Sequence, residues 1–268
     1  MIKTFKGKSW LALAALPVLA ACGGGTTTTS SEPFTVLGTT ITGTETVAVL
    51  SLDTGTSTTA STSGTYNYTT DKVTVSSTDY STDGSSVLSN DQSSGRYSYV
   101  AGLAGTSDYK LFALQTSADD LPSNVTVVYE GQGFVVVTAN SATFEGAVES
   151  TITANFGTTG NTVDVLLDSL ASDATKNGVA MVPADFTGAE RIEFNDLVIS
   201  GAGYTEGAGS SVVIHGFGLA TTSNTTGATI DVTGVFAGDT GTETAGVGVI
   251  DQGGTGDEAF VSFSGTSD

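Results

Sequence analysis

The chain has 268 residues and carries 28 Asp or Glu residues against 8 Lys or Arg, so its formal net charge is −20 at pH 7. Such an acidic surface repels the phosphates of nucleic acids and anionic lipid headgroups, which excludes DNA, RNA and peripheral membrane binding, and it favours solubility. Only 13% of the residues are charged, and Thr, Val and aromatic residues alternate along much of the chain. This pattern predicts folded β-structure rather than disorder.

The first 21 residues have the parts of a secretory signal peptide. Lys3, Lys6 and Lys8 precede the apolar run WLALAALPVLAA, which is shorter than the ~20 apolar residues that a membrane-spanning helix needs. The run leads into Cys22, the only cysteine of the chain. Residues 19–22, LAAC, resemble the lipobox of bacterial lipoproteins, which implies cleavage before Cys22 and a lipid on its thiol. Lipidation also explains why an exported protein has a single unpaired cysteine.

Residues 22–33 begin with this cysteine and continue as GGGTTTTSSEP. The segment has no apolar residue to pack, so we predict a flexible tether. Two or more acyl chains make a stable anchor, and Gly23 after the cysteine favours sorting to the outer membrane. We therefore expect a lipid-anchored protein of the outer membrane, at the cell surface or on the periplasmic face.

Period-two alternation predicts short strands through the rest of the chain. The alternating segments are 66–77, 94–105, 108–116, 124–139, 142–157, 190–201, 210–220, 228–238 and 258–265. Residues 162–178 could form a helix but also alternate, and we predict a strand that leads into a loop. The sequence EGQG at 130–133 is predicted to be a hairpin turn.

Many short strands separated by Gly-rich turns indicate an all-β protein, either a sandwich or a barrel. The composition changes near LQTSADDLPSN, because the strands after it have stronger apolar alternation and most of the phenylalanines. We predict a small β-rich domain at 34–115 and a second β domain, a barrel, at 116–268. The predicted core residues of the second domain are Phe144, Phe156, Phe194, Phe236, Phe260 and Phe263.

Four segments of the second half carry glycines and aromatic residues at characteristic spacings. The residues concerned are Pro122, Tyr129 and Gly131; Phe144, Gly146, Ala147 and Phe156; Ile192, Ile199, Gly201, Tyr204 and Gly207; and Gly234, Phe236, Gly238, Glu243 and Gly246. In this order they resemble the barrel domain of transferrin-binding-protein-like bacterial surface lipoproteins. The chain departs from the family pattern at Asp239, where a proline is usual, at Val247, where a second glycine is usual, and in lacking a basic residue after the last strand.

The resemblance implies an antiparallel eight-stranded barrel, preceded by a smaller β-rich domain, on a lipid-anchored protein. It also implies a non-catalytic function: binding of a host protein, a haem carrier or another iron source at the bacterial surface. Two other classes stay open, namely a structural or adhesive surface lipoprotein and a hydrolase that uses paired carboxylates.

Few residues are suited to catalysis or metal binding. The single histidine, His215, has the opposite parity to Val212 and Ile214, so we predict an ordinary strand residue that faces solvent, with a haem ligand as the alternative. The sequence has no cluster of Cys and His for zinc, we predict no cofactor and no metal site, and the acidic loops allow only incidental calcium binding. The carboxylates available to a hydrolase are Glu130, Glu145, Glu149, Glu190 and Glu193.

Tyrosines are concentrated in the first domain, where each either half-buries against a small sheet or contributes to a partner surface. They are Tyr66, Tyr68, Tyr80, Tyr97, Tyr99 and Tyr109.

Overall fold

A computed structural model describes the part of the chain from residue 35 to residue 267, with gaps. The described residues are 35–36, 39–40, 44–53, 58–67, 70, 72–81, 87–89, 98–102, 108–113, 115–139, 141–157, 160–182, 185–186, 188–217, 219–223, 229–238, 240–251 and 258–267. The predicted signal peptide, Cys22 and the predicted tether lie outside them. Among these residues, no helix has the length and apolar character needed to cross a membrane.

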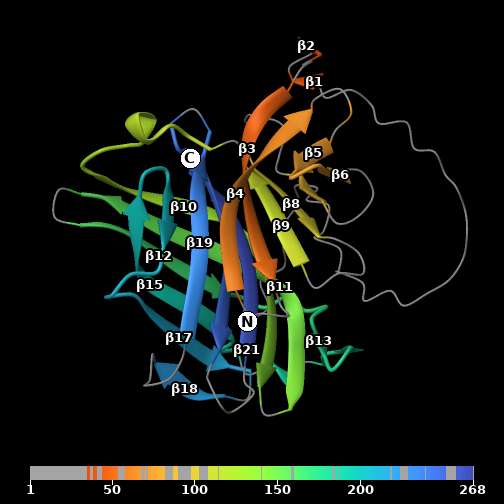
Figure 1. Cartoon of the computed structure of the whole chain (residues 1–268). Helices are drawn as coiled ribbons and strands as arrows, with labels where there is room; N and C mark the ends of the chain where they lie inside the picture. Colours follow the sequence, from red (N-terminus) through yellow and green to blue (C-terminus); the bar gives the residue numbers. More distant parts are fainter. Residues whose placement is uncertain are drawn as a thin grey trace, which may run out of the picture.

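Eight antiparallel strands of the described chain close into a barrel (Figure 1). In ring order they are β10 (Val125–Ala139), β11 (Ala142–Phe156), β12 (Asn161–Asp168), β15 (Arg191–Ser200), β16 (Gly203–Thr205), β19 (Thr229–Ala237), β20 (Glu243–Asp251) and β21 (Glu258–Thr266). Each strand pairs with the next, and β21 pairs with β10 to close the ring. Closure pairs most of the edges through which strands rich in Thr and Val associate, and its shortest seam joins β16 to Thr233–Val235 of β19. The predicted fold class, an antiparallel eight-stranded barrel after a smaller β-rich part, is confirmed.

Short strands extend the barrel sheet at its margins. They are β13 (Thr175–Lys176), β14 (Val179–Ala180), β17 (Ser211–Gly216) and β18 (Leu219–Ser223). The turn between β13 and β14 is Asn177-Gly178, with φ of 54° and 74°, as a two-residue hairpin turn requires. Since β12 is a strand and a loop joins it to β13, the strand-and-loop prediction for residues 162–178 is confirmed.

The predicted hairpin turn at residues 130–133 is wrong, because β10 runs through them without a break. Gly131 lies opposite Gly265 of β21. A Cβ atom on Gly131 would be only 2.2 Å from the carbonyl oxygen of Ser264. This glycine therefore permits close approach of a neighbouring strand, which is the other common use of glycine inside a strand.

A seven-stranded antiparallel sheet precedes the barrel, in the order β6-β5-β4-β3-β9-β8-β7. Its strands are β3 (Thr44–Asp53), β4 (Thr58–Asn67), β5 (Lys72–Val75), β6 (Thr78–Ser81), β7 (Val87–Ser89), β8 (Ser98–Gly102) and β9 (Asp108–Ala113). Two short strands before it, β1 (Thr35–Val36) and β2 (Thr39–Thr40), pair with each other.

The sheet packs on the outer wall of the barrel (Figure 1), where β3 and β4 contact β19 and β20. The buried apolar residues between the two bodies form what we call the sheet–barrel core. They are Ala48, Leu50, Leu52, Leu111 and Ala113 from the sheet and Val235, Ala237, Ala245, Val247 and Val249 from the barrel. The barrel wall under the sheet is therefore apolar on both of its faces.

Phe260 corrects part of the predicted core. Its neighbours Ala259 and Val261 point into the barrel, so alternation along the strand turns Phe260 outward, where it is half-buried against the sheet–barrel core. The other five predicted phenylalanines are buried in the barrel interior, as predicted: Phe144, Phe156, Phe194, Phe236 and Phe263.

Hydrogen bonds also join the two bodies. The Thr59 backbone N–H of β4 donates to the Asp231 carboxylate of β19 at 2.9 Å, and the Thr59 hydroxyl donates to the same carboxylate. In the connector, the Thr116 N–H donates to the Phe236 carbonyl at 2.9 Å and the Thr116 hydroxyl donates to the Gly238 carbonyl at 2.6 Å. The connector continues through a 3₁₀ turn, η1 (Ala118–Asp120), into β10.

The shared core predicts that sheet and barrel unfold together. Leu50 is fully buried there, and Leu50→Ala should lower the free energy of unfolding by about 3 kcal/mol while keeping a single transition. The measurement is urea unfolding followed by circular dichroism. Thr62→Ala, at an exposed position of β4, is the control and should change stability by less than about 0.5 kcal/mol. An early transition of the sheet beside an unchanged barrel transition would contradict the prediction.

Candidate functional site

The barrel interior is filled with side chains. Phe236 lies at the centre of an aromatic group, with its ring centroid 5.1 Å from that of Phe156, 5.3 Å from Tyr204 and 6.0 Å from Tyr129. Aliphatic residues from β10, β11, β12, β15 and β21 fill the space around it. An eight-stranded barrel is just wide enough for its own side chains to fill it, so contact with a large partner must use the outside.

Two glycines make this packing possible. Tyr204 lies opposite Gly234 on β19, and Phe263 lies opposite Gly246 on β20. A Cβ on Gly234 would be 2.1 Å from the Tyr204 ring, and one on Gly246 would be 2.5 Å from the Phe263 ring. Each aromatic ring thus covers the glycine of its neighbouring strand. Packing alone explains these four residues, three of which belong to the family resemblance.

The two buried tyrosines near Phe236 also satisfy their hydroxyl groups inside the protein. The Tyr129 hydroxyl donates to the Gly241 carbonyl at 2.7 Å. The Tyr204 hydroxyl lies 3.0 Å from the Thr244 hydroxyl, which itself donates to the Val235 carbonyl, so Tyr204 is the donor of the pair. Burial raises the pKa of both phenols far above the ordinary value. Both residues therefore hold this end of the barrel together in the neutral form.

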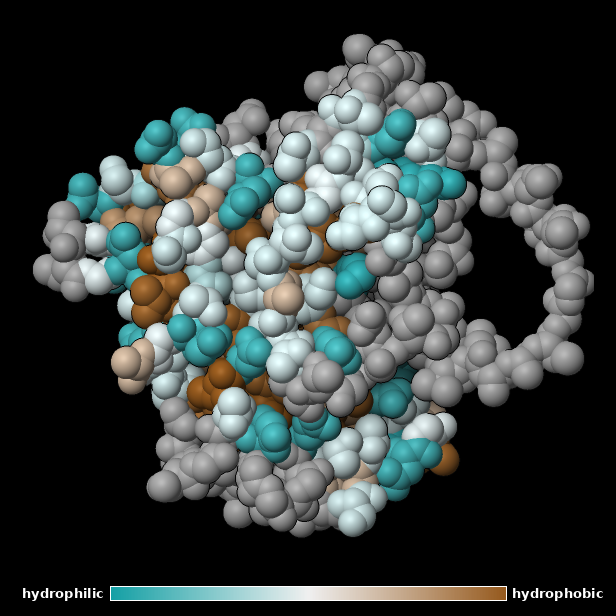
Figure 2. Space-filling model, in the orientation of Figure 1, coloured by the Kyte–Doolittle hydropathy of each residue, from teal (hydrophilic) through white to brown (hydrophobic). Residues whose placement is uncertain are grey.

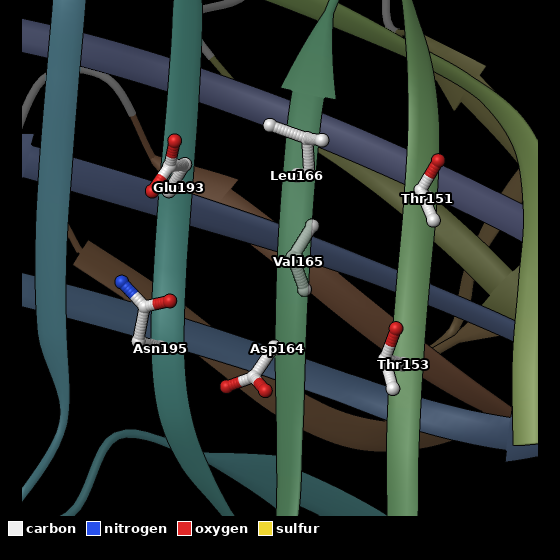
Figure 3. A pocket seen from close by; sticks show the side chains of 7 residues that line it. All are labelled: Thr151, Thr153, Asp164, Val165, Leu166, Glu193 and Asn195. Atoms are coloured by element: carbon white, nitrogen blue, oxygen red, sulfur yellow. The ribbon is translucent and has the colours of Figure 1, made fainter. Parts of the chain in front are cut away.

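The outer wall formed by β11, β12 and β15 carries a shallow depression of about 250 Å³ (Figure 3). The residues that line it are Thr151 and Thr153 of β11, Asp164, Val165 and Leu166 of β12, and Glu193 and Asn195 of β15. Thr151, Leu166 and Glu193 form one cross-strand row. Val165 is buried in the barrel core, whereas Leu166 is half-exposed between hydroxyl and carboxylate groups. We call this surface the wall depression.

Two carboxylates of the wall depression already have partners. One oxygen of Asp164 accepts the Asp196 N–H at 2.8 Å, at a bulge where β15 shifts register against β12 and Asp196 has φ of 56°. Glu193 Oε1 lies 2.7 Å from Arg191 Nε. Asp164 and Glu193 are therefore held in place by contacts within the protein. The other polar groups at the surface of the wall depression are the hydroxyls of Thr151 and Thr153 and the amide of Asn195, and Leu166 is the apolar group beside them.

His215 faces outward on β17, as predicted, while Val212 and Ile214 are buried. It lies opposite Arg191, and its Nε2 is 3.1 Å from Nη2 of that arginine. Because a guanidinium has no acceptor, the histidine Nε2 accepts this hydrogen bond. The alternative of a haem ligand receives no support from this arrangement, since Nε2 is occupied.

The five glutamates considered for hydrolysis are spread over the barrel. Glu130 and Glu149 are exposed, Glu145 and Glu193 are half-buried, and Glu190 is buried. Glu190 accepts the Gly188 N–H at 3.0 Å. In the strand registers of the described chain, none of the five directly opposes another.

Other sequence-derived candidates are only partly described. Cys22 lies outside the described residues, and so do the side chains of all the first-domain tyrosines except Tyr66. Tyr66 is buried, so it packs within the sheet and does not contribute to a partner surface. Within the part of the chain that the structure describes, no group of three or more His, Cys, Asp or Glu residues is arranged to hold a metal ion.

The sequence matches no protein-family description and no curated protein. The fold, in contrast, is similar to solved structures of transferrin-binding protein B. A variant from Haemophilus parasuis Hp5, described as a vaccine antigen, superposes with a TM-score of 0.55 at 14% identity over 83% of this chain and 45% of its own. The isotype 1 protein from serogroup B Neisseria meningitidis gives 0.54 at 14% identity over 83% of this chain and 43% of its own.

An intact transferrin-binding protein B with N and C lobes gives a TM-score of 0.52 at 14% identity, over 82% of this chain and 46% of its own. This chain therefore spans less than half the length of these structures. The expected resemblance in fold is confirmed: the chain has a transferrin-binding-protein-like fold. At this identity the likeness concerns the fold alone.

The buried tyrosines make stability depend on alkaline pH. Their folded-state pKa values are raised above the ordinary value, so the stabilisation is fully present below about pH 10 and is lost as the unfolded chain begins to release these protons. Tyr204→Phe should therefore reduce the fall in urea midpoint between about pH 9 and pH 11. At pH 7 it should cost about 1 kcal/mol for the lost hydrogen bond. An unchanged alkaline slope would contradict this role for Tyr204.

Proposed function

We propose that the chain is a lipid-anchored binding protein of the bacterial outer membrane, which takes a protein or an iron- or haem-related ligand on its outer surface without catalysis. The observation that carries this proposal is the filled barrel, whose interior is occupied by its own aromatic and aliphatic side chains. A barrel of this kind offers its outer wall and its loops for recognition.

The anchor is supported by the N-terminal sequence. The lipobox-like LAAC ends at Cys22, and the polar residues that follow it have no apolar side chain to bury. On this proposal the lipid holds the protein to the membrane, and the residues between Cys22 and the first sheet provide reach away from it.

The ligand class is supported by the fold. The similar structures are named for binding transferrin, and we extend to this chain the coarser property, recognition of a protein or of another iron-related ligand. The wall depression is the proposed contact surface. Its volume of about 250 Å³ lies below that of typical small-molecule pockets, which suits an extended contact better than enclosure of a small molecule.

Lipidation is tested at Cys22. In cells labelled with a palmitate analogue, the protein should incorporate the label and Cys22→Ala should abolish it, because the alanine has no thiol to acylate. The unprocessed variant should also keep its N-terminal residues, as measured by intact mass. Labelling that survives Cys22→Ala would rule out this anchor.

Ligand binding is tested with the mature chain carrying Cys22→Ser, immobilised and offered transferrin, haemoglobin and free haem. We expect saturable binding of one of them, weakened at least tenfold by Leu166→Arg, because the long cation fills the wall depression. Ser172→Arg adds the same charge at an exposed loop position and should leave binding unchanged. Failure of all three probes would contradict the iron-related proposal, and equal binding by both arginine variants would exclude the wall depression.

A further inference from the structure

Part of the outer edge of β4 has no partner strand in the described chain and lies beside the barrel. β4 pairs with β3 along its whole length, but β5 covers only its last residues, from Thr65 to Asn67. Over residues 59–63 no strand of the described chain pairs with the outer edge of β4. The edge belongs to the body that packs on the barrel, and it lies beside β19 (Figure 1).

The direction of the backbone groups along this edge follows from Thr59. Its N–H donates to Asp231 of β19 and so points away from β3. In an antiparallel ladder the groups of alternate residues point to the same side, so Ser61 and Ser63 also direct their N–H and C=O groups outward. The next residue of this series, Thr65, meets β5, which is consistent with that direction.

The contact with Asp231 shows that the outward N–H groups of this edge can donate to an acceptor beside it. The Asp231 carboxylate takes the Thr59 N–H and hydroxyl, in the place where an added strand would supply a carbonyl oxygen. Beyond Thr59 the edge continues through Ala60, Ser61, Thr62 and Ser63, all of which are exposed. In Figure 2 the surface over β4 is pale, as expected for Ser and Thr.

The usual protections of an edge strand are missing from this segment. Residues 58–64, TTASTSG, contain no proline, no lysine and no acidic residue, and β4 pairs with β3 in an unbroken register without a bulge. Natural edges are normally blocked by such charges, prolines or bulges. An exposed edge with free N–H and C=O groups is the template on which an extended peptide adds as a further strand.

We propose that the outer edge of β4 at residues 59–63 binds an extended, basic segment of a partner protein as an additional β-strand. Its backbone would bond to Ser61 and Ser63, and its basic side chains would lie towards the barrel. Two carboxylates lie there. One belongs to Asp231, and the other to Glu206, which accepts the N–H of the next residue of β19, Val232, at 2.9 Å. No Lys or Arg occurs in β4, β16 or β19, and Lys72 of the neighbouring strand β5 lies 3.9 Å from a carboxylate oxygen of Asp79.

The charge of the whole molecule favours a basic partner over a second copy. Two copies that met edge to edge would each bring a formal net charge of −20, and their repulsion opposes association. The same negative field attracts a basic segment. The inference goes beyond the ligand contact proposed for the wall depression, which lies on β11, β12 and β15, and depends neither on that site nor on the lipid anchor.

The test uses isotope-labelled protein from residue 22 to residue 268, with Cys22→Ser, and an acetylated, amidated peptide of alternating Lys, Val and Thr. We expect the peptide to shift the amide signals of Ser61 and Ser63 and to slow their hydrogen exchange at least tenfold. Ser61→Pro removes the outward N–H, a change that edge strands tolerate, and should abolish binding. Ser61→Ala keeps the N–H and should bind within twofold of the parent.

Each other outcome counts against the proposal. Equal binding by the Ser61→Pro and Ser61→Ala variants, both folded by thermal melting, would show that the edge N–H is not used. A peptide with Glu in place of Lys that binds equally well would remove the basic character of the partner. Ser61 and Ser63 amides that are protected before peptide is added would mean that another segment of the chain, or a second copy if protection rises with concentration, already covers the edge.

Discussion

The sheet–barrel core is the constraint on which the rest of the structure depends. It requires β20 and the last four residues of β19, Gly234–Ala237, to be buried on both faces, because one face fills the barrel and the other contacts the sheet. Every residue of β20 from Glu243 to Ile250 is buried accordingly. Strands buried on both faces lose the alternation of apolar and polar residues. In β20 small and larger apolar residues alternate instead. Ala245, Val247 and Val249 point to the sheet, while Gly246 and Gly248 face the barrel interior and leave room for the rings of Phe263 and Phe194.

That arrangement leaves the outer wall as the surface for the proposed recognition. The rings of Tyr204 and Phe263 occupy the space above glycines of neighbouring strands, and the phenol groups find their hydrogen-bond partners within the wall. The barrel is therefore a solid support. One part of its outer wall is used to hold the sheet, and the part formed by β11, β12 and β15 stays exposed with the wall depression. On the proposed function, a partner would meet surfaces set by strand register, with little dependence on an internal cavity.

Alternation along the sequence was enough to predict the all-β fold, the strand and loop at 162–178 and the outward direction of His215, because each depends on parity within one segment. It failed where a distant strand decides the outcome. The glycines of EGQG indicate a turn locally, but Gly131 is required by the close approach of Ser264 on β21. Phe260 has the opposite parity to Phe263, so alternation turns it out of the barrel, and only the packed sheet explains why this outward side chain is still half-buried. The wall depression and the β4 edge were not predicted, since both arise from pairing between strands whose register the sequence does not reveal.

The barrel and the sheet solve the problem of strand edges in different ways. Closure pairs most of the backbone of the eight barrel strands, with its shortest seam at Gly203–Thr205 of β16 against Thr233–Val235 of β19, whereas the sheet leaves part of β4 without a described partner strand. An edge of Thr and Ser with no local charge would ordinarily invite association with its own copies. Here the repulsion is supplied by the molecule as a whole, through a formal net charge of −20. This negative field repels a second acidic copy and attracts a basic strand. It therefore keeps copies of the chain apart while a basic strand can reach the same backbone groups. The acidic composition that favours solubility is thus also what allows an uncharged edge to persist.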